Sequence, residues 1–160
     1  MIEIKNISKK FGKLEVLKNV SVSCNSGQCI ALIGPNGCGK TTLIKSILGM
    51  VIPDSGSMEF NQKSIFGDYL YREKIGYMPQ IGRYPDTMTI GEIIEMVKKI
   101  RNSKDNLDED LFRDFEIEKM LNKQMRTLSG GTTQKISAVL AFMFNPDVLI
   151  LDEPTAGLDP

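Results

Sequence analysis

Hydrophobic residues in the first half of the chain form short runs that predict β-strands. Polar and apolar positions alternate within residues 2–7 and 16–24, whereas residues 28–33 form a nearly continuous apolar run. A polar turn is expected at residues 8–13, and a Pro-Asp-Ser-Gly turn precedes the next strand. The predicted strands are residues 2–7, 16–24, 28–33, 57–60 and 74–78.

The second half of the chain has the periodicity of helices. Thr89 and Glu92 have the spacing of a capping box, and apolar residues then recur every three to four positions up to Ile100. Short helices are expected at residues 111–115 and 117–121, and an amphipathic helix around residues 136–143. Residues 148–151 return to a buried strand. Residues 89–144 therefore read as a helical insertion in a β-rich chain.

Composition narrows the functional class. The 160 residues include 20 basic and 20 acidic side chains, so the net charge gives no reason to expect nucleic-acid binding. No apolar stretch is long enough to span a bilayer, and the N-terminus lacks a secretory signal. Three cysteines without C-x-x-C spacing fit a reduced, cytosolic protein. Because the chain has no histidine, any hydrolysis has to rest on carboxylates, a lysine and a metal.

A glycine-rich motif follows the apolar run at residues 28–33 and precedes a predicted helix. That helix is expected to end at Gly49. It fits the pattern G-x-x-x-x-G-K-[ST], in which backbone N–H groups surround phosphates at a helix N-terminus. Lys40 would reach the β- and γ-phosphates, and the Thr41 hydroxyl would hold Mg²⁺. The motif, called here the phosphate loop, comprises Gly34, Pro35, Asn36, Gly37, Cys38, Gly39, Lys40, Thr41 and Thr42.

Two further segments carry chemistry that suits a nucleotide. The strand 148–151 ends in Asp152 and Glu153. Asp152 would hold Mg²⁺ through water, and Glu153 would polarise the attacking water. Ser129, Gly130 and Gly131 open the predicted amphipathic helix and offer a second anion site, although such a segment is usually only a helix cap.

In this combination the chain resembles the nucleotide-binding subunit of ATP-binding cassette (ABC) transporters over essentially all of its length. Phe11 is similar to the family's aromatic residue that stacks on adenine, and Gln80 to its glutamine that contacts Mg²⁺. Residues 128–131, called here the signature segment, resemble the family signature, with Thr132 where glutamine is commonest. Asp152 and Glu153 match the acidic pair, and residues 156–159, with Asp159, match a loop that contacts the partner subunit.

The resemblance implies an α/β fold. We expect a phosphate-loop NTPase (RecA-like) core with an N-terminal antiparallel β subdomain and an inserted helical subdomain. Residues 1–80 would form the nucleotide-binding core, residues 81–144 the helical subdomain, and residues 145–160 the return to the core.

The resemblance also implies the activity and its partners. Two subunits would form a head-to-tail dimer that holds ATP between the phosphate loop of one and the signature segment of the other. Glu153 and Lys40 would serve hydrolysis, with Mg²⁺ held by Thr41, Gln80 and Asp152. A transmembrane permease would dock near residues 80–87, with Arg83 and Tyr84 as candidate contacts, so the subunit would be cytoplasmic and peripheral on the inner face of the cell membrane.

The family continues beyond this point with another strand and a histidine that touches the γ-phosphate. We therefore expect an N-terminal fragment of a longer ATPase, with weak or absent hydrolysis by the 160 residues alone. Two alternatives stay open, a soluble ABC-type ATPase of DNA repair or the ribosome and a non-catalytic fragment. A GTPase switch would need an N-K-x-D motif, and the Asn-Lys-Gln-Met segment at residues 122–125 lacks the aspartate.

Overall fold

The computed structural model describes residues 1–102 and 106–155, and its contacts divide the chain into two compact units, Met1–Arg72 and Glu73–Pro160. Each unit is described by itself. The division falls within the expected core segment 1–80, and the three-part organisation 1–80, 81–144 and 145–160 stays a prediction.

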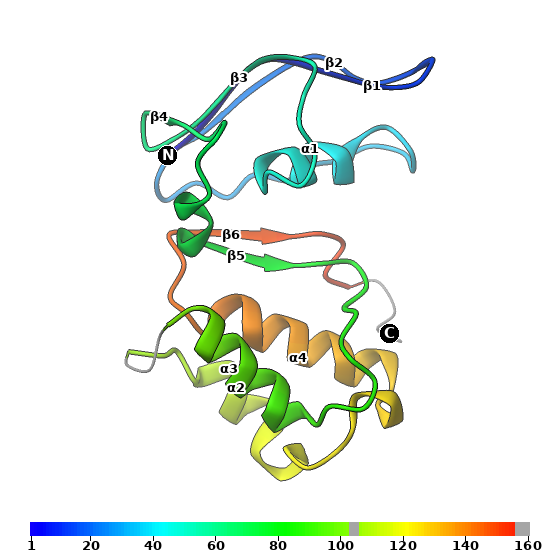
Figure 1. The fold of residues 1–160 in the computed structure, drawn as a ribbon, viewed down its shortest axis with the longest axis vertical. Coiled ribbons are helices and arrows are strands. Elements are labelled where there is room, and N and C mark those ends of the chain that lie inside the picture. Colours follow the sequence, from blue (N-terminus) through cyan, green and yellow to red (C-terminus); the bar gives the residue numbers. More distant parts are fainter. Residues whose placement is uncertain (103–105, 156–160) are drawn as a thin grey trace. The chain divides into compact units, whose positions relative to one another are not determined.

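The first unit contains a four-stranded antiparallel sheet in the order β2-β1-β3-β4 (Figure 1). Its strands are β1 (Ile2–Phe11), β2 (Leu14–Cys24), β3 (Ser55–Phe60) and β4 (Lys63–Ser64). The polar turn predicted at residues 8–13 begins too early, because β1 continues to Phe11. Lys9 and Lys10 pair with β2, and strand pairing overrides their polar character.

Two asparagines let β1 and β2 pair over this length. Asn6 and Asn19 have φ angles of 53° and 50°, and the β1–β2 register shifts nearby. Such bulges leave backbone N–H groups outside the ladder. Here Asn6 N donates to Ser21 Oγ at 2.9 Å, and Asn19 N donates to Ser8 Oγ at 3.0 Å. The serine hydroxyls therefore accept hydrogen bonds from the two backbone N–H groups that the irregular register leaves unpaired.

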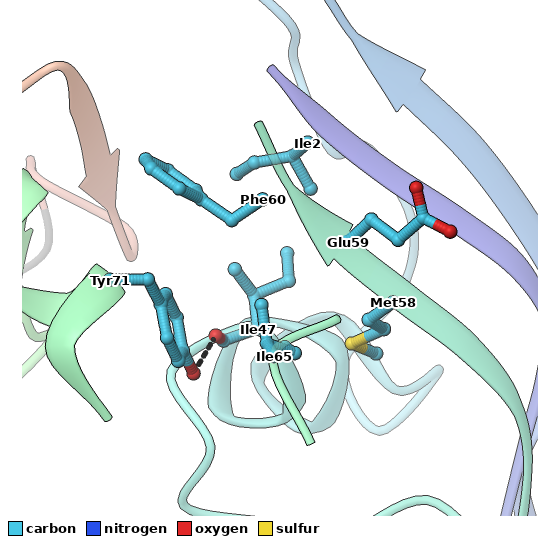
Figure 2. A pocket seen from close by; sticks show the side chains of 7 residues that line it. All are labelled: Ile2, Ile47, Met58, Glu59, Phe60, Ile65 and Tyr71. Atoms are coloured by element: carbon cyan, nitrogen blue, oxygen red, sulfur yellow. Dashed lines mark hydrogen bonds between the residues drawn. The ribbon is translucent and has the colours of Figure 1, made fainter. Parts of the chain in front are cut away.

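The helix α1 (Lys40–Ile47) packs its buried residues Leu43 and Ile44 in this unit, and it ends before Gly49, as expected. Figure 2 shows side chains of β1 and β3 facing Ile47 of α1 and Ile65, while Glu59 turns away, as strand alternation requires. The Tyr71 hydroxyl donates to the Ile47 carbonyl at 2.8 Å, and its ring lies 5.9 Å from that of Phe60. This apolar layer fixes α1 and the phosphate loop that precedes it.

Residues 28–33 do not form the predicted strand. They have no regular secondary structure, and Ile33 is 92% exposed. Their apolar, β-branched character suits a strand, but a strand also needs a neighbour for its backbone groups. Among the described residues none pairs with this segment.

The second unit contains the two strands predicted at residues 74–78 and 148–151, as β5 (Ile75–Met78) and β6 (Val148–Leu151). The structure adds that they pair in parallel. The register runs from Ile75 opposite Val148 to Met78 opposite Leu151. The expectation that β6 is buried is wrong, because its residues are half-buried and Leu151 is exposed. The helices of this unit lie on one side of the pair (Figure 1), which leaves part of the strand uncovered.

The helical part of this unit surrounds one apolar cluster. Its elements are α2 (Ile90–Ile100), α3 (Asp110–Asp114), η2 (Ile117–Met120), η3 (Met125–Thr127) and α4 (Gly130–Phe142), where η denotes a 3₁₀ helix. The buried residues of the cluster are Ile90, Ile93, Ile94, Ile117, Met125, Ile136, Val139 and Met143. The capping box of Thr89 and Glu92 is present at α2, as predicted. No helix in the described residues is long and apolar enough to cross a membrane.

The loop before β3 is fastened to β1 by one carboxylate. Asp54 accepts from Lys9 Nζ and from the Lys10 backbone N, both at 2.7 Å. These two donors, the lysine side chain first, hold the pKa of Asp54 below its usual value. A group whose pKa is lower in the folded state stabilises the fold above its unfolded pKa, and that contribution is lost as the pH falls through the folded pKa.

We predict that Asp54→Asn lowers the melting temperature at pH 7, because the neutral amide loses the charged bond to Lys9. The difference from the unchanged chain should shrink as the pH falls below the ordinary aspartate pKa of about 3.9. Thermal unfolding scans between pH 7 and pH 2 measure both effects. Asp147→Asn is the control, because Asp147 is exposed and makes no hydrogen bond among the described residues; an equal effect of the two changes would contradict the assignment.

Candidate functional site

The phosphate loop turns into α1 at Gly39, a position that only glycine suits. Its φ angle is 103°, and a Cβ atom there would lie 2.8 Å from the Val16 carbonyl oxygen. A side chain would therefore both strain the backbone and collide with β2. The helix begins at the next residue, Lys40.

The first turn of α1 offers free donors to an anion. No side chain caps this helix, and its first turn holds no acidic residue. At α2 and α4, by contrast, the side chains of Thr89 and Ser129 accept from backbone N–H groups. The uncapped N–H groups and the helix dipole favour a negatively charged group at this end.

Lys40 brings a positive charge to the same end of α1. Its Nζ donates to the Gly34 carbonyl at 2.9 Å and to the Pro35 carbonyl at 3.3 Å, so the side chain folds back over the loop. Cys38 is exposed, and a Cβ atom on Gly34 would lie 2.7 Å from its Sγ. The loop therefore presents amides, one ammonium and one thiol.

The other residues expected around the nucleotide in this unit are more open. Thr41 and Thr42 are partly exposed, and the Thr42 carbonyl accepts from Ser46 Oγ at 2.8 Å. Phe11, at the end of β1, is 50% exposed, and the Lys9 ammonium lies 5.5 Å from its ring centroid. An exposed ring at the end of a hairpin suits stacking on a flat ligand.

In the second unit the parallel strands bring three expected residues to one edge. Asp152 follows β6 and is 4% exposed, and its backbone N donates to the Met78 carbonyl at 2.9 Å. Gln80 follows β5, and its Nε2 donates to Glu153 Oε2 at 2.6 Å. Burial and, second, the charge of Asp152 raise the pKa of Tyr77 in β5. Since both strands end here, residues more than 70 positions apart meet side by side.

The signature segment forms the beginning of α4. Ser129 is the N-cap, and its Oγ accepts from the Thr132 backbone N at 3.2 Å. The Ser129 and Thr132 hydroxyls are also hydrogen-bonded to each other, at 2.9 Å. Ser129 and Gly130 are exposed and Gly131 is partly exposed. Thr132, the departure from the commonest family residue, therefore adds a second hydroxyl beside that of Ser129.

Several contacts around this edge were missed by sequence reasoning. Tyr84 is not a plain surface aromatic, because its hydroxyl is hydrogen-bonded to Ser137 Oγ at 2.9 Å and its ring packs against the apolar cluster. Gln134, inside α4, donates from Nε2 to the Gln80 carbonyl at 2.9 Å. Arg83 is exposed. The sequence contains one hint of these contacts, because Gln134 and Ser137 are polar residues near the apolar residues of α4. It does not show which groups they bond to.

Oxygen donors in the expected set suit Mg²⁺, which prefers carboxylate and other oxygen ligands and usually binds few protein groups. The described residues hold no cluster of three His, Cys, Asp or Glu side chains. Because Gln80 uses Nε2 toward Glu153, its Oε1 is the atom that would serve a cation. Thr41 belongs to the first unit, and Gln80 and Asp152 belong to the second. Asp159 lies outside the described residues.

Comparison with known proteins shows which family the chain belongs to. Residues 17–156 match the sequence model of the family described as ABC transporter. The chain is 34% identical to the sulfate/thiosulfate import ATP-binding protein CysA of Pectobacterium atrosepticum, covering 99% of this chain and 50% of that protein. It is 31% identical to the Nod factor export ATP-binding protein I of Ralstonia nicotianae, covering 100% and 51%. The chain thus spans about half the length of the curated relatives it matches.

Solved structures also resemble this chain in their fold. An ATP-binding subunit of an ABC transporter superposes with a TM-score of 0.89 at 31% identity, covering 99% of this chain and 68% of that one. A bacterial ABC transporter cassette, solved as a dimer, gives a TM-score of 0.85 at 25% identity, covering 99% and 76%. The expected phosphate-loop NTPase fold class is confirmed by these matches. The chain belongs to the ABC transporter family, and its fold is that of the family's ATP-binding subunits.

Proposed function

We propose that this chain binds and hydrolyses ATP to power an ABC transporter. The observation that carries the proposal is the open N-terminus of α1, where Lys40 and uncapped backbone N–H groups face the glycine-rich loop. This arrangement suits the β- and γ-phosphates of a nucleoside triphosphate. The names of the relatives support ATP as the nucleotide.

Each residue of the expected site then has a role. The amides of Gly37, Gly39 and Thr42 and the Lys40 ammonium bind the phosphates, and Phe11 stacks on adenine. Glu153 orients and polarises the attacking water, and Gln80 holds Glu153 through its side chain. Thr41 of the first unit and Gln80 and Asp152 of the second unit are the residues that would hold Mg²⁺, which would offset the negative charge of the phosphates.

A second copy of the subunit completes the site. Ser129, Gly130 and Gly131 lie at the start of α4, in the second unit, and would bind the γ-phosphate held by a partner's phosphate loop. Asp159 would contact that partner. A related cassette that was solved as a dimer supports the pairing of two subunits.

The energy of ATP would be delivered to a transmembrane permease. Residues 80–87 would dock on it, with exposed Ile81 and Arg83 as contacts. The subunit would then be cytoplasmic and peripheral on the inner face of the membrane. One relative is named for import and another for export at similar identity, so the proposal names neither the direction nor the cargo.

The first test is binding of Mg·ATP to this chain by isothermal titration calorimetry. Lys40→Ala should weaken binding about 10- to 100-fold, because the phosphates lose a charged hydrogen bond. Lys45→Ala, an exposed lysine in the last turn of the same helix, is the matched control and should leave the affinity unchanged. If the unchanged chain is folded and binds no Mg·ATP, the proposed function is wrong.

The role of Glu153 has a separate test in the full-length protein. Glu153→Gln should lower the ATP turnover by about 10² to 10⁴, since the amide cannot act as a base. ATP binding should persist, and the closed dimer should accumulate in size-exclusion chromatography with ATP. Glu118→Gln, an exposed glutamate elsewhere in the same unit, is the control. Equal effects of Glu153→Gln and Lys40→Ala on binding would contradict the two assigned roles.

Alkylation of Cys38 is a direct test of nucleotide binding. Its thiol is exposed within the phosphate loop, so alkylation should block ATP binding and ATP should slow alkylation. Mass spectrometry can follow the labelling rate in a chain that keeps Cys38 and carries serine in place of the other two cysteines. A chain that keeps only the exposed Cys29 is the control and should label at the same rate with and without ATP. ATP-independent labelling of Cys38 would count against this use of the loop.

A further inference from the structure

Gln134 is a buried polar residue of α4. It is 7% exposed and lies on the same helix as the buried Ile136 and Val139. Burying a side-chain amide is unfavourable unless its polar atoms are hydrogen-bonded. The Gln134 Nε2 donates to the backbone carbonyl of Gln80 at 2.9 Å. The helix therefore holds one specific residue of the segment that follows β5.

The same segment is fastened to α4 at two further points. The Tyr84 and Ser137 hydroxyls are hydrogen-bonded, and Ser137 Oγ also donates to the Thr133 carbonyl at 3.1 Å. A Cβ atom on Gly82 would collide with Ser137 Oγ, so a side chain at this point would displace the Ser137 hydroxyl. Residues 80–84 and the middle of α4 are consequently packed as one body.

Gln80 is thus held on one side and holds Glu153 on the other. Its carbonyl accepts from Gln134, and its side-chain Nε2 donates to Glu153 Oε2 at 2.6 Å. Glu153 has a φ angle of 50°, a left-handed conformation that glutamate rarely adopts. Such a conformation persists only where surrounding contacts determine it. The bond from Gln80 is one of these contacts.

We propose that Gln134 is a positioning residue that fixes Gln80 and, through it, the carboxylate of Glu153. The consequence for hydrolysis rests on the proposed function, in which Glu153 polarises the attacking water. Because Ser129 caps the start of α4, a ligand that moves or fixes this end of the helix also changes the position of Gln80 and Glu153. The signature segment and the base on the same subunit are therefore coupled through Gln134.

Gln134→Met tests the proposal, because the methionine side chain is similar in length to that of glutamine but is apolar and has no N–H donor. Ser137→Ala is the matched control: it removes the neighbouring hydrogen bond to Tyr84 and leaves the Gln134–Gln80 contact intact. Both changes weaken the attachment of residues 80–84 to α4. Only the first one acts on Gln80 itself.

The first readout is the side-chain amide of Gln80 in ¹⁵N-labelled protein, assigned by the loss of its signals in Gln80→Ala. In the unchanged chain these signals should shift when Glu153→Ala removes the hydrogen-bond acceptor. Gln134→Met should move them in the same direction, whereas Ser137→Ala should leave them in place. This measurement needs neither ATP nor turnover.

The second readout is turnover in the full-length protein. Gln134→Met should lower kcat about tenfold with little change in the KM for ATP, since a small displacement of a catalytic group is costly while the phosphate loop is untouched. Ser137→Ala should keep kcat within about twofold of the unchanged protein.

The outcomes separate the two proposals. Gln80 amide signals that stay unchanged in a folded Gln134→Met chain overturn the positioning role, whatever the turnover. If the unchanged full-length protein does not hydrolyse ATP, the proposed function fails, and the amide signals still decide whether Gln134 positions Gln80. If Gln134→Met does not fold, Gln134→Asn, which is too short to reach the Gln80 carbonyl, gives the same decision.

Discussion

Hydrogen bonding between strands far apart in the sequence holds each unit together. In the first unit β1 pairs with β3, so that Ile2 lies opposite Phe60 and residues near the N-terminus close the sheet over α1 (Figure 1). In the second unit β5 pairs with β6 across the whole helical region. A strand without such a neighbour leaves its backbone groups unpaired, which explains why residues 28–33 stay irregular despite their apolar side chains.

The same pairing creates the candidate chemistry of the second unit. Parallel strands end at the same edge, and here Gln80 and Glu153 follow those ends and meet. The helices then refine the geometry, because α4 holds the Gln80 backbone through Gln134 and the Tyr84 ring through Ser137. In the first unit the apolar layer of Figure 2 fixes α1, and Gly39 lets the loop approach β2 closely enough to begin the helix at Lys40.

Local signals in the sequence predicted the elements that local contacts can form. The capping box at Thr89, the end of α1 before Gly49 and the amphipathic stripe of α4 each depend on residues within a few positions of one another. The short helix expected at residues 117–121 also forms, as a 3₁₀ helix at Ile117–Met120. The phosphate loop, the signature segment and the acidic pair were recognisable because each is a contiguous motif.

The sequence by itself therefore determined the family, the order of the helices and most strands, and the identity of the motifs. Tertiary structure decided which strands find a neighbour, as the longer β1 and the irregular residues 28–33 illustrate. It also decided that Tyr84 and Gln134 turn inward to bond with Ser137 and Gln80. The physical reason is that a helix cap is satisfied within one turn of chain, whereas a strand or a buried amide is satisfied only by groups that folding brings from elsewhere.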